Sequence, residues 1–579
     1  MKQDIQTIRH SLSHILAYAV RQQFQNAKLG FGPAIENGFY YDFELPKNIG
    51  PQDLPQLEKR MHELLKQNFS FIKKTITRAE ALQLFQGQPY KLEIIKELKD
   101  SEITTYESGK FIDLCAGPHI VSTNEIPTEA FKLTKVAGAY WRGSEKNPML
   151  QRIYGVAFET KKELDEYLKM LEEAEKRDHR ILGEKLDLFM VDEKIGKGLP
   201  LWLPNGYFVR KILEDYMYKI EKDAGYLHVL TPILAKEELY KTSGHLEHYK
   251  EDMYAPIVIE NERYYLKPMN CPHHHAIFSH RQKSYKDLPL RIAEFGNVYR
   301  YEKSGVLNGL IRVRGFTQND SHIYATQETL EKEIIDILKM FKKTYSDFKI
   351  SDYWFRLSLP DFNNKEKYGN IENKKIWEEG ASALRNVLKK SKLTFKEAMG
   401  EASFYGPKID IQTKDIYGKE DTIATIQVDY YSAPKFNLTY IAKDGTKKFP
   451  VIIHRAILGS FDRFFAFLIE RTAGDLPVWL SPIQVEVINV GDKHVKYAKS
   501  IYKELIDNEI RAKFSEENQT VGKRIREAEL KKFPYVLVVG DKELKAKNVC
   551  VRTRGKKKLE NMKLSKFIQK VKIEVDKKK

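Results

Sequence analysis

FGNVYRYEKSGVLNGLIRVRGFTQNDSHIY, residues 295–324, is the stretch that decides the fold of the middle of this 579-residue chain. Two runs rich in β-branched and aromatic residues, AEFGNVYRYE (293–302) and LIRVRGFTQNDSHIYAT (310–326), flank the segment KSGVLNG (303–309). Such runs on either side of a short glycine-containing segment are typical of a β-hairpin. We therefore expect an antiparallel sheet at the centre of residues 190–476.

Arginines mark the same hairpin. Arg300 follows a strand in EFGNVYR, Arg312 and Arg314 alternate in LIRVRGF, and Arg463 lies in GSFDRFF, within an apolar helix. A guanidinium among aromatic residues needs an anionic partner, and several such groups on one sheet suit a polyphosphate, although a structural ion pair would account for any single one. The chain has no GxxxxGK[ST], and no GxGxxG between a strand and a helix, which argues against a P-loop or Rossmann nucleotide site.

The segments on either side have different patterns. Residues 1–158 combine an opening helix with the glycine-containing FGPAIENGFYYDF, which predicts a mixed α+β domain. Residues 159–189 have no proline and one leucine stripe, which predicts a connecting helix. After LPVWLSP (476–482), apolar strands alternate with charged helices, which predicts a small parallel α/β unit over residues 477–579. The expected fold is multidomain α+β, with the antiparallel sheet in residues 190–476.

Composition narrows the class of protein. At 579 residues the chain is too long for one core, because domains hold about 100–200 residues. It has no apolar run of about 18 residues that could span a membrane, and its polar start lacks the apolar segment of a signal peptide, so we expect a cytoplasmic protein. Residues 541–579 hold 15 Lys and Arg against 5 Asp and Glu, which favours a polyanionic partner or a solubilising tail.

Four side chains of metal-ligand type lie in the N-terminal segment. His10 and His14 would share one helix face, and Cys115 and His119 have the same spacing. The set indicates a zinc site, but ordinary surface or core histidines have this spacing too. Asp113 beside them would equally suit acid-base catalysis or the positioning of a water. These alternatives remain open from the residues alone.

The middle region carries Cys271, His322 and His454, which are separated by 51 and 132 residues. No metal-binding spacing is recognisable in these distances, so taken alone they are expected to have packing or surface roles. The run HHH at 273–275 is a distractor, because consecutive side chains on a helix point in different directions and cannot all face one ion.

Longer motifs identify a family. GYLHVLTPIL (225–234), the hairpin quoted above and HRAILGSFDRF (454–464) resemble motifs 1, 2 and 3 of class II aminoacyl-tRNA synthetases. KPMNCP, RVRGFTQNDSHI, FYGPKID and HRAILGS resemble threonyl-tRNA synthetases in particular. HSLSHILAYAV, NGFYYDF, IDLCAGPHI, GAYWRGSEKNPMLQRIYG and RDHRILGEKLDLF resemble the editing domain and linker helix of that family. The resemblance runs from about residue 9 to the C-terminus.

The resemblance implies a ligase that joins L-threonine to tRNA(Thr) through threonyl-adenylate, uses ATP with Mg²⁺, and hydrolyses mischarged seryl-tRNA. It implies one Zn²⁺ per subunit, bound in residues 190–476 rather than at the N-terminal cluster that ligand spacing favours, because the family's editing pocket works with a bound water and no metal. The positions that match the family's zinc ligands are Cys271, His322 and His454, and those that match its editing pocket are His10, His14, Asp113, Cys115 and His119. For ATP and the amino acid, the resemblance assigns Arg300 to the α-phosphate, Arg463 to the γ-phosphate, Glu302 and Phe316 to the adenine, and Gln318, Asp320, Lys408, Arg312, Thr425, Gln427 and Ser460 to the rest of the pocket. For the tRNA, it assigns His245 to the terminal ribose and Asn518, Glu543 and Arg552 to the anticodon.

Two departures from the family pattern are expected to matter. Family members commonly begin with a ubiquitin-like domain, which we expect this chain to lack. Where the family usually reads WQCGT, this chain has EDTIAT, so Thr422 takes the place of the glutamine and Ala424 that of the glycine, which alters the details of ATP binding.

Two other functions compete with this interpretation. An inactive paralogue that binds tRNA-like RNA would lose the motif arginines or the zinc ligands, and all of them are present. A free-standing deacylase would need only the first 160 residues. By analogy with class II motif 1, we also expect a homodimer.

Overall fold

The computed structural model describes residues 4–100, 102–144, 146–368, 374–515 and 519–579. The chain forms two compact units, residues 1–172 and 173–579. Among the described residues, no helix combines the length and the apolar character needed to cross a lipid bilayer.

The first unit is built around helix α1 (Ile5–Gln23), as the sequence predicts. The helix packs on a sheet in the order β1 (Lys28–Leu29), β3 (Gly38–Glu44), β8 (Met149–Ala157) and β7 (Phe131–Tyr140), with β2 (Ala34–Ile35) paired to β3. Ile15 and Leu16 of α1 are fully buried against Phe39 and Tyr41 of β3, in a core that includes α2 (Leu54–Leu65). A second sheet comprises β4 (Phe71–Thr77), β5 (Glu102–Ser108) and β6 (Phe111–Leu114), beside α3 (Arg78–Leu84) and α4 (Pro89–Glu97).

Residues 159–189 contain two helices instead of the single connecting helix that the leucine stripe predicts. These are α5 (Lys161–Arg177) and α6 (His179–Lys185). The break falls at Asp178, whose backbone is non-helical (φ −52°, ψ 123°) and whose side chain accepts a hydrogen bond from the Arg180 amide at 2.8 Å. An aspartate that caps a new helix in this way favours interruption over continuation.

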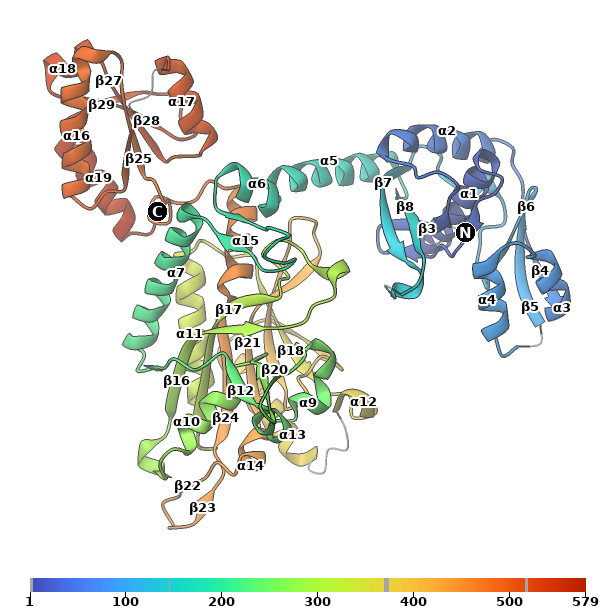
Figure 1. Ribbon diagram of the computed structural model, residues 1–579, viewed down its shortest axis with the longest axis horizontal. Coiled ribbons are helices and arrows are strands. Elements are labelled where there is room, and N and C mark those ends of the chain that lie inside the picture. The colour runs from blue at the N-terminus through green and yellow to red at the C-terminus, as the bar shows by residue number, and fades with distance from the viewer. Residues whose placement is uncertain (1–3, 101, 145, 369–373, 516–518) are drawn as a thin grey trace. The chain divides into compact units, whose positions relative to one another are not determined.

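The second unit contains an eight-stranded sheet, shown beside helices α7 and α11 in Figure 1. Its strand order is β11 (Leu227–His228), β16 (Leu290–Tyr299), β17 (Gly315–Ala325), β24 (Val451–Ser460), β21 (Glu420–Asp429), β20 (Lys408–Lys414), β18 (Trp354–Leu359) and β19 (Phe395–Met399). The six inner strands pair antiparallel, as expected, and only the two edge strands pair parallel.

One face of this sheet forms the main hydrophobic core. Helices α7 (Pro204–Asp223), α11 (Leu330–Asp347), α13 (Lys374–Lys390) and α15 (Phe461–Thr472) supply apolar side chains to it. Arg455 of β24 and Glu221 of α7 form an ion pair at 2.7 Å in which both side chains are fully buried. Because an unpaired buried charge is costly, this pair ties α7 to the sheet in one arrangement.

The hairpin quoted at the outset forms, with a longer loop than its sequence predicts. Strand β16 ends at Tyr299 and β17 begins only at Gly315, so Arg312 and Arg314 lie in the loop and do not alternate along a strand. We call residues 300–314 the hairpin loop. The backbones of Asn308 and Arg312 exchange two N–H···O hydrogen bonds, which fold this loop back on itself. The second strand is therefore shorter than its composition suggests.

Shorter elements surround the sheet. They are α8 (Glu237–Thr242), α9 (His245–His248), α10 (Cys271–Ser279), α12 (Lys365–Tyr368), α14 (Ser432–Lys435), β9 (Phe189–Met190), β10 (Leu201–Trp202), β12 (Leu234–Lys236), β13 (Ile257–Ile259), β14 (Glu262–Leu266), β15 (Lys283–Ser284), β22 (Tyr440–Ile441) and β23 (Lys447–Lys448).

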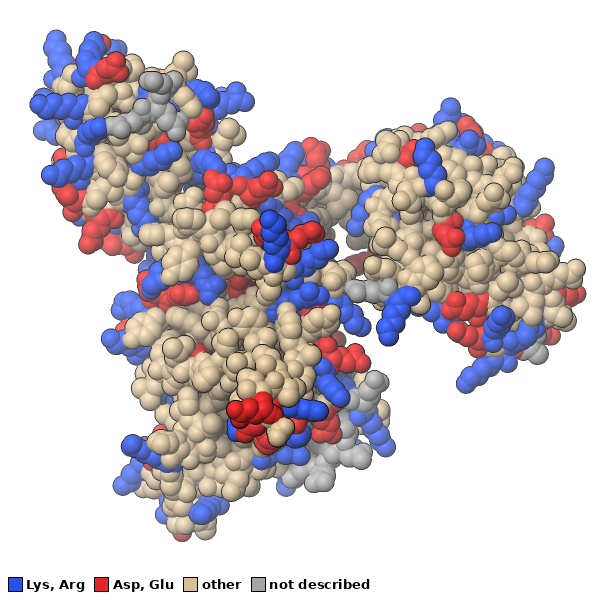
Figure 2. Space-filling view, in the orientation of Figure 1, with Lys and Arg blue, Asp and Glu red and all other residues tan. Residues whose placement is uncertain are grey.

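The C-terminal part of the second unit has its own core and a five-stranded sheet in the order β26 (Ala512–Ser515), β25 (Val485–Asn489), β27 (Tyr535–Val539), β28 (Val549–Thr553) and β29 (Glu560–Met562). The first three strands are parallel, as predicted, whereas β28 and β29 add an antiparallel hairpin that the prediction left out. Helices α16 (Val495–Asp507), α17 (Val521–Leu530), α18 (Asp541–Ala546) and α19 (Leu564–Asp576) complete it. Figure 2 shows many Lys and Arg side chains over the visible face of this part.

Candidate functional site

A cavity of about 550 Å³ lies on the face of the eight-stranded sheet opposite the main core. Strand β17 explains which side chains reach it, since side chains alternate between the two faces of a strand. Gln318, Asp320 and His322 line the cavity, whereas Ile323 belongs to the main core. Thirteen of the fifteen residues predicted for this region line the cavity: Cys271, Arg300, Glu302, Arg312, Phe316, Gln318, Asp320, His322, Thr425, Gln427, His454, Ser460 and Arg463.

Cys271, His322 and His454 come together in the wall of this cavity. One ligand atom from each lies within 4.8 Å of the others, and all three residues are buried. His322 and His454 are direct cross-strand partners on β17 and β24, and Cys271 begins helix α10 beside them. Strand pairing therefore brings together residues whose separations in the sequence show no metal-binding pattern, and it buries them rather than leaving them at the surface.

The two histidines each have one ring nitrogen already engaged. Nε2 of His454 lies 2.9 Å from the buried carboxylate of Asp429, and Nδ1 of His322 lies 2.8 Å from Nδ1 of His274. Burial, with the neighbouring His454, holds the pKa of His322 well below its ordinary value, so its ring is neutral. One thiol and two imidazoles, each imidazole with one nitrogen left over, fit the donor set of a zinc site with open positions.

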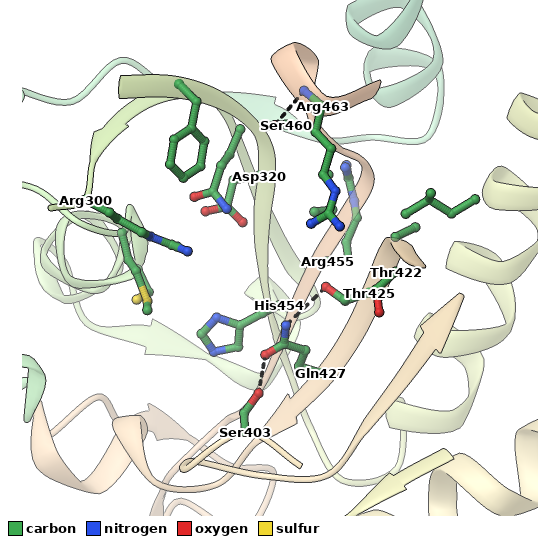
Figure 3. A pocket seen from close by; sticks show the side chains of 18 of the residues that line it. Arg300, Asp320, Ser403, Thr422, Thr425, Gln427, His454, Arg455, Ser460 and Arg463 are labelled. Atoms are coloured by element: carbon green, nitrogen blue, oxygen red, sulfur yellow. Dashed lines mark hydrogen bonds between the residues drawn. The ribbon is translucent and has the colours of Figure 1, made fainter. Parts of the chain in front are cut away.

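Arginines approach the same cavity from two sides, as Figure 3 shows for Arg300 and Arg463. The guanidinium of Arg300 lies 5.2 Å from the ring centre of Phe316. Arg463 is in the first turn of α15, where its amide donates to Ser460 at 3.1 Å, and its guanidinium pairs with Asp421. Two cationic groups facing one cavity are suited to a polyphosphate.

Two of the residues predicted for this region do not line the cavity. His245 is buried in α9, its Nδ1 lies 2.7 Å from the hydroxyl of Ser243, and burial with the positive charge of Arg300 lowers its pKa to about 3. Lys408 neighbours the cavity residue Gln427 on the next strand, but its amino group pairs with Asp410 at 3.1 Å.

Other cavity residues were missed by sequence reasoning. Gln427 accepts a hydrogen bond from Ser403 at 2.8 Å and donates one to Thr425 at 3.1 Å (Figure 3). It also accepts a hydrogen bond from the Tyr405 hydroxyl. Ser403 and Tyr405 belong to the quoted motif segment FYGPKID and the residue before it, so the motif pointed near them without assigning them a role. Arg455 also reaches the cavity wall, although its guanidinium is engaged with Glu221.

A third group of ligand-type side chains, Asp178, His179 and Glu470, lies together and is buried. Nδ1 of His179 lies 2.6 Å from the Glu470 carboxylate on α15, and its Nε2 accepts from the Leu310 amide at 3.1 Å. Since both ring nitrogens are used, His179 joins α6 to α15 and to the hairpin loop.

The first unit brings together the N-terminal cluster that the sequence predicts, His10, His14, Cys115 and His119. The thiol of Cys115 lies 3.3 Å from Nε2 of both His10 and His119. Burial raises the pKa of Cys115 to about 11 and is the main cause of a lowered pKa at both His10 and His119. A neutral thiol among neutral imidazoles can exchange hydrogen bonds with a polar substrate or water.

Asp113 sits at the base of this cluster in a buried charged group. Its carboxylate pairs with Lys91 at 2.6 Å, accepts from the Tyr41 hydroxyl at 2.5 Å, and lies 3.9 Å from Nε2 of His14. Lys91 and Asp113 are almost completely buried. Sequence reasoning missed Lys91 and Tyr41, because no local pattern links α4 and β3 to the end of β6.

Three segments of the chain match known protein families. Residues 250–472 match the tRNA synthetase class II core domain (G, H, P, S and T), residues 484–574 an anticodon binding domain, and residues 103–154 the threonyl and alanyl tRNA synthetase second additional domain. A threonine–tRNA ligase of Geobacillus sp. (strain WCH70) is 46% identical over 99% of this chain and 89% of its own length. The chain belongs to the threonyl-tRNA synthetase family. Threonine–tRNA ligase 1 of Bacillus subtilis (strain 168) is 44% identical over 100% of this chain and 90% of its own.

A solved structure from this family is also similar. The RNA binding domain of threonyl-tRNA synthetase from Cryptosporidium parvum Iowa II is 37% identical, with a TM-score of 0.64, and the match covers 69% of this chain and 98% of that one. Threonyl-tRNA synthetases are thus similar to this chain in both sequence and fold, as the motifs of the sequence indicate.

The residues that the family resemblance assigns to the anticodon lie in the C-terminal part. Glu543 is in the first turn of α18, where its carboxylate accepts from the Gly540 amide at 2.9 Å. Arg552 is on β28, 3.5 Å from Glu529. Asn518 lies outside the described residues.

Proposed function

We propose that the chain attaches L-threonine to tRNA(Thr) through threonyl-adenylate at the cavity in the second unit, and hydrolyses mischarged seryl-tRNA at the N-terminal cluster. The observation that carries this proposal is the presence of the Cys271, His322 and His454 group in the wall of the same cavity as Arg300 and Arg463. We assign editing to residues 1–158, a linker to 159–189, synthesis to 190–476 and anticodon binding to 477–579.

The choice of threonine poses two different energetic problems. Valine has nearly the same shape but lacks the hydroxyl, and a site that demands this polar contact can reject such an analogue by about 10⁴ to 10⁵. Serine keeps the hydroxyl and lacks one methyl, which is worth only about 1–3 kcal/mol. Valine can therefore be excluded when the amino acid binds, whereas serine requires a second, hydrolytic site.

Cys271, His322 and His454 would hold one zinc ion. When bound, the ion supplies open coordination positions for the amino group and hydroxyl of threonine. Metal analysis tests this assignment: the parent should carry about one zinc per chain, and Cys271→Ala should lose it, with Cys115→Ala as the matched control. Full zinc in Cys271→Ala together with loss in Cys115→Ala would reverse the assignment.

In adenylate formation the threonine carboxylate attacks the α-phosphorus of ATP, and pyrophosphate leaves with its Mg²⁺. Arg300 would contact the α-phosphate and Arg463 the γ-phosphate, where fixed positive charge lowers the energy of the developing negative charge. Glu302 and Phe316 would hold the adenine, and Gln318, Asp320 and Gln427 the amino acid and ribose side of the pocket, alongside Arg312, Thr425, Ser460 and Lys408.

His245 has a separate proposed role in the transfer step, where it would help to deprotonate the terminal ribose of the tRNA. Its pKa of about 3 keeps the imidazole neutral at physiological pH, so that it can accept a hydrogen bond from the ribose hydroxyl. Amino-acid-dependent pyrophosphate exchange across all twenty amino acids tests the choice of threonine, and a chain that activated another amino acid in preference would contradict the proposal.

The second unit divides its work between the cavity and the C-terminal domain. Phosphate contacts would position the tRNA through the lysines of residues 541–579, while Asn518, Glu543 and Arg552 would contact the anticodon bases. Arg300→Ala should abolish pyrophosphate exchange, whereas Arg552→Ala should retain it and weaken only the charging of tRNA. Equal loss of exchange in both variants would refute this division.

Editing is assigned to His10, His14, Asp113, Cys115 and His119. Replacing His10 and His14 together by Ala should leave threonine activation unchanged while seryl-tRNA accumulates. Discrimination against serine would then fall to what one methyl gives, about 10² at most. If the double variant cleared preformed seryl-tRNA as fast as the parent, the editing assignment would be withdrawn.

We further propose that the chain forms a homodimer. Exposed apolar residues support this: Leu230 is 90% exposed and Leu227 58%, and every residue of β13 (Ile257–Ile259) is exposed. A second copy of the chain would cover some or all of these residues through a two-fold interface. Leu230→Asp should convert the dimer to a monomer in analytical ultracentrifugation, and a parent chain that sedimented as a monomer would contradict the assignment.

A further inference from the structure

Helix α10 carries three consecutive histidines, and the middle one has a role that its sequence context conceals. His273, His274 and His275 are all buried, and His274 is completely so. Nδ1 of His274 lies 2.8 Å from Nδ1 of His322, the proposed zinc ligand on β17. The run is therefore more than a distractor, since one of its members touches a ligand without being one.

A chain of buried polar groups continues from His274 into the protein. Its Nε2 lies 3.1 Å from a carboxylate oxygen of Glu294 on β16. The other oxygen of Glu294 accepts from the Thr231 amide at 2.8 Å and lies 3.4 Å from the amino group of Lys267. Lys267 and Glu294 are at most 1% exposed. Burial opposes ionisation of Glu294, but hydrogen bonds from His274 and Thr231 outweigh it and lower its pKa to about 2.

The carboxylate of Glu294 sets the direction of every proton in this chain. A carboxylate can only accept, so Nε2 of His274 must carry the proton that lies between them. In a neutral imidazole the other nitrogen is then an acceptor, so Nδ1 of His274 accepts from Nδ1–H of His322. This leaves Nε2 of His322 without a proton, with a lone pair free for a metal ion.

The reverse arrangement is unfavourable for a physical reason. If Nδ1 of His274 carried the proton, the lone pair of its Nε2 would face the Glu294 carboxylate at 3.1 Å with no hydrogen between them. Two buried acceptors in contact lose a hydrogen bond and repel each other, and in a buried site neither loss is made good by water. The positive charge of Lys267 stabilises the Glu294 carboxylate and balances its negative charge, so the pair as a whole is neutral.

We propose that His274 and Glu294 are positioning residues that fix the tautomer and ring orientation of His322 for metal binding. This inference rests on the zinc site of the proposed function. His454 is oriented differently, by direct contact of its Nε2 with Asp429 at 2.9 Å. The two histidine ligands are thus held by two independent partners, one a carboxylate and the other an imidazole that relays a carboxylate.

Zinc affinity measured by competition with a chelator tests the proposal without relying on aminoacylation. His274→Ala should weaken zinc binding by about 10-fold to 100-fold, the usual effect of removing a group that orients a metal ligand. His273→Ala is the matched control. It lies one residue away on the same helix, and in the described part of the chain its ring makes no hydrogen bond to Cys271, His322 or His454, so the parental affinity is expected.

Two near-isosteric variants keep the test valid if His274→Ala folds poorly. In His274→Asn the amide oxygen can still accept from His322, so the affinity should be recovered in part. Glu294→Gln offers an amide N–H to His274, which permits the reversed proton order, so zinc binding should weaken although the side chain keeps its size. Thermal unfolding of each apo variant shows whether the fold is retained.

A reference variant separates failure of this inference from failure of the proposed function. If His322→Ala kept full zinc, the site itself would be misassigned. If His322→Ala lost zinc while folded His274→Asn and Glu294→Gln both bound it with parental affinity, the zinc site would stand and the positioning role would be overturned. Weakening in His274→Ala and Glu294→Gln, with partial recovery in His274→Asn, supports the role.

Discussion

Replacing Asp421 by Asn should lower the KM for ATP. Asp421 pairs with Arg463, the arginine proposed to contact the γ-phosphate, so ATP must compete with this carboxylate for the guanidinium. The side chains of Arg463 and Asp421 are 40% and 27% exposed, so solvent screens the pair, and it is worth about 0.2–1 kcal/mol. At about 1.4 kcal/mol for each factor of ten, removing the competition should lower the KM about 1.4-fold to 5-fold.

The assay is threonine-dependent pyrophosphate exchange at varied ATP concentration. The KM for threonine should stay constant, because the ion pair lies on the phosphate side of the cavity. Glu420→Gln is the control, since it removes the same charge one residue earlier on β21, where alternation directs the side chain to the opposite face. An unchanged or raised KM for ATP in Asp421→Asn, or an equal fall in both variants, would refute competition by Asp421.

Three further predictions concern buried groups. His179→Ala should speed hydrogen exchange in the hairpin loop and raise the KM for ATP, because two bonds that hold the loop and α15 are lost; unchanged exchange would contradict this. Lys91→Met should destabilise the first unit by about 3–5 kcal/mol in urea and slow hydrolysis of seryl-tRNA, since it leaves a buried carboxylate unpaired, whereas the exposed Lys74→Met should cost at most about 1 kcal/mol. The pKa of His245 is about 3 in the folded chain, below its ordinary 6.5, so unfolding takes up a proton between these two values. The contribution of His245 to the free energy of unfolding therefore falls as pH drops through that window, by up to about 1.4 kcal/mol per pH unit. The free energy of unfolding of His245→Gln should depend less steeply on pH between pH 6.5 and 5, and an identical slope would count against burial of a neutral ring.

Local patterns were enough to predict the main elements of this fold. The runs around residues 295–324 predict a hairpin because the period of two and the glycines act over a few residues, and the hairpin forms. The same reasoning places Arg312 and Arg314 on a strand. It fails there because the loop is shaped by contacts such as that of Leu310 with His179, more than a hundred positions away in the chain.

The two clusters of Cys and His show more clearly what local sequence patterns cannot predict. Spacing favours zinc at His10 and His14, because four residues on a helix form a visible pattern, while Cys271 and His454 have no such pattern. Cys271, His322 and His454 come together only because particular strands pair. Among the sequence features, only the longer family motifs indicate that these three residues belong together. Lys91 and His274 could not be assigned even by motif, since each works through a buried partner on another element.

The cross-strand pairing of His322 with His454 determines where this chain can change length. The two residues meet because β17 and β24 are paired strands. The segment that connects these strands can therefore gain or lose residues at exposed turns without separating the pair. Deleting one residue within β24 ahead of His454 is different, because Arg455 would then stand opposite His322 and the faces of the strand would be exchanged. Insertions tolerated near residue 418 and excluded near residue 453 would be the signature of a pair of residues, His322 and His454, whose contact is set by strand register.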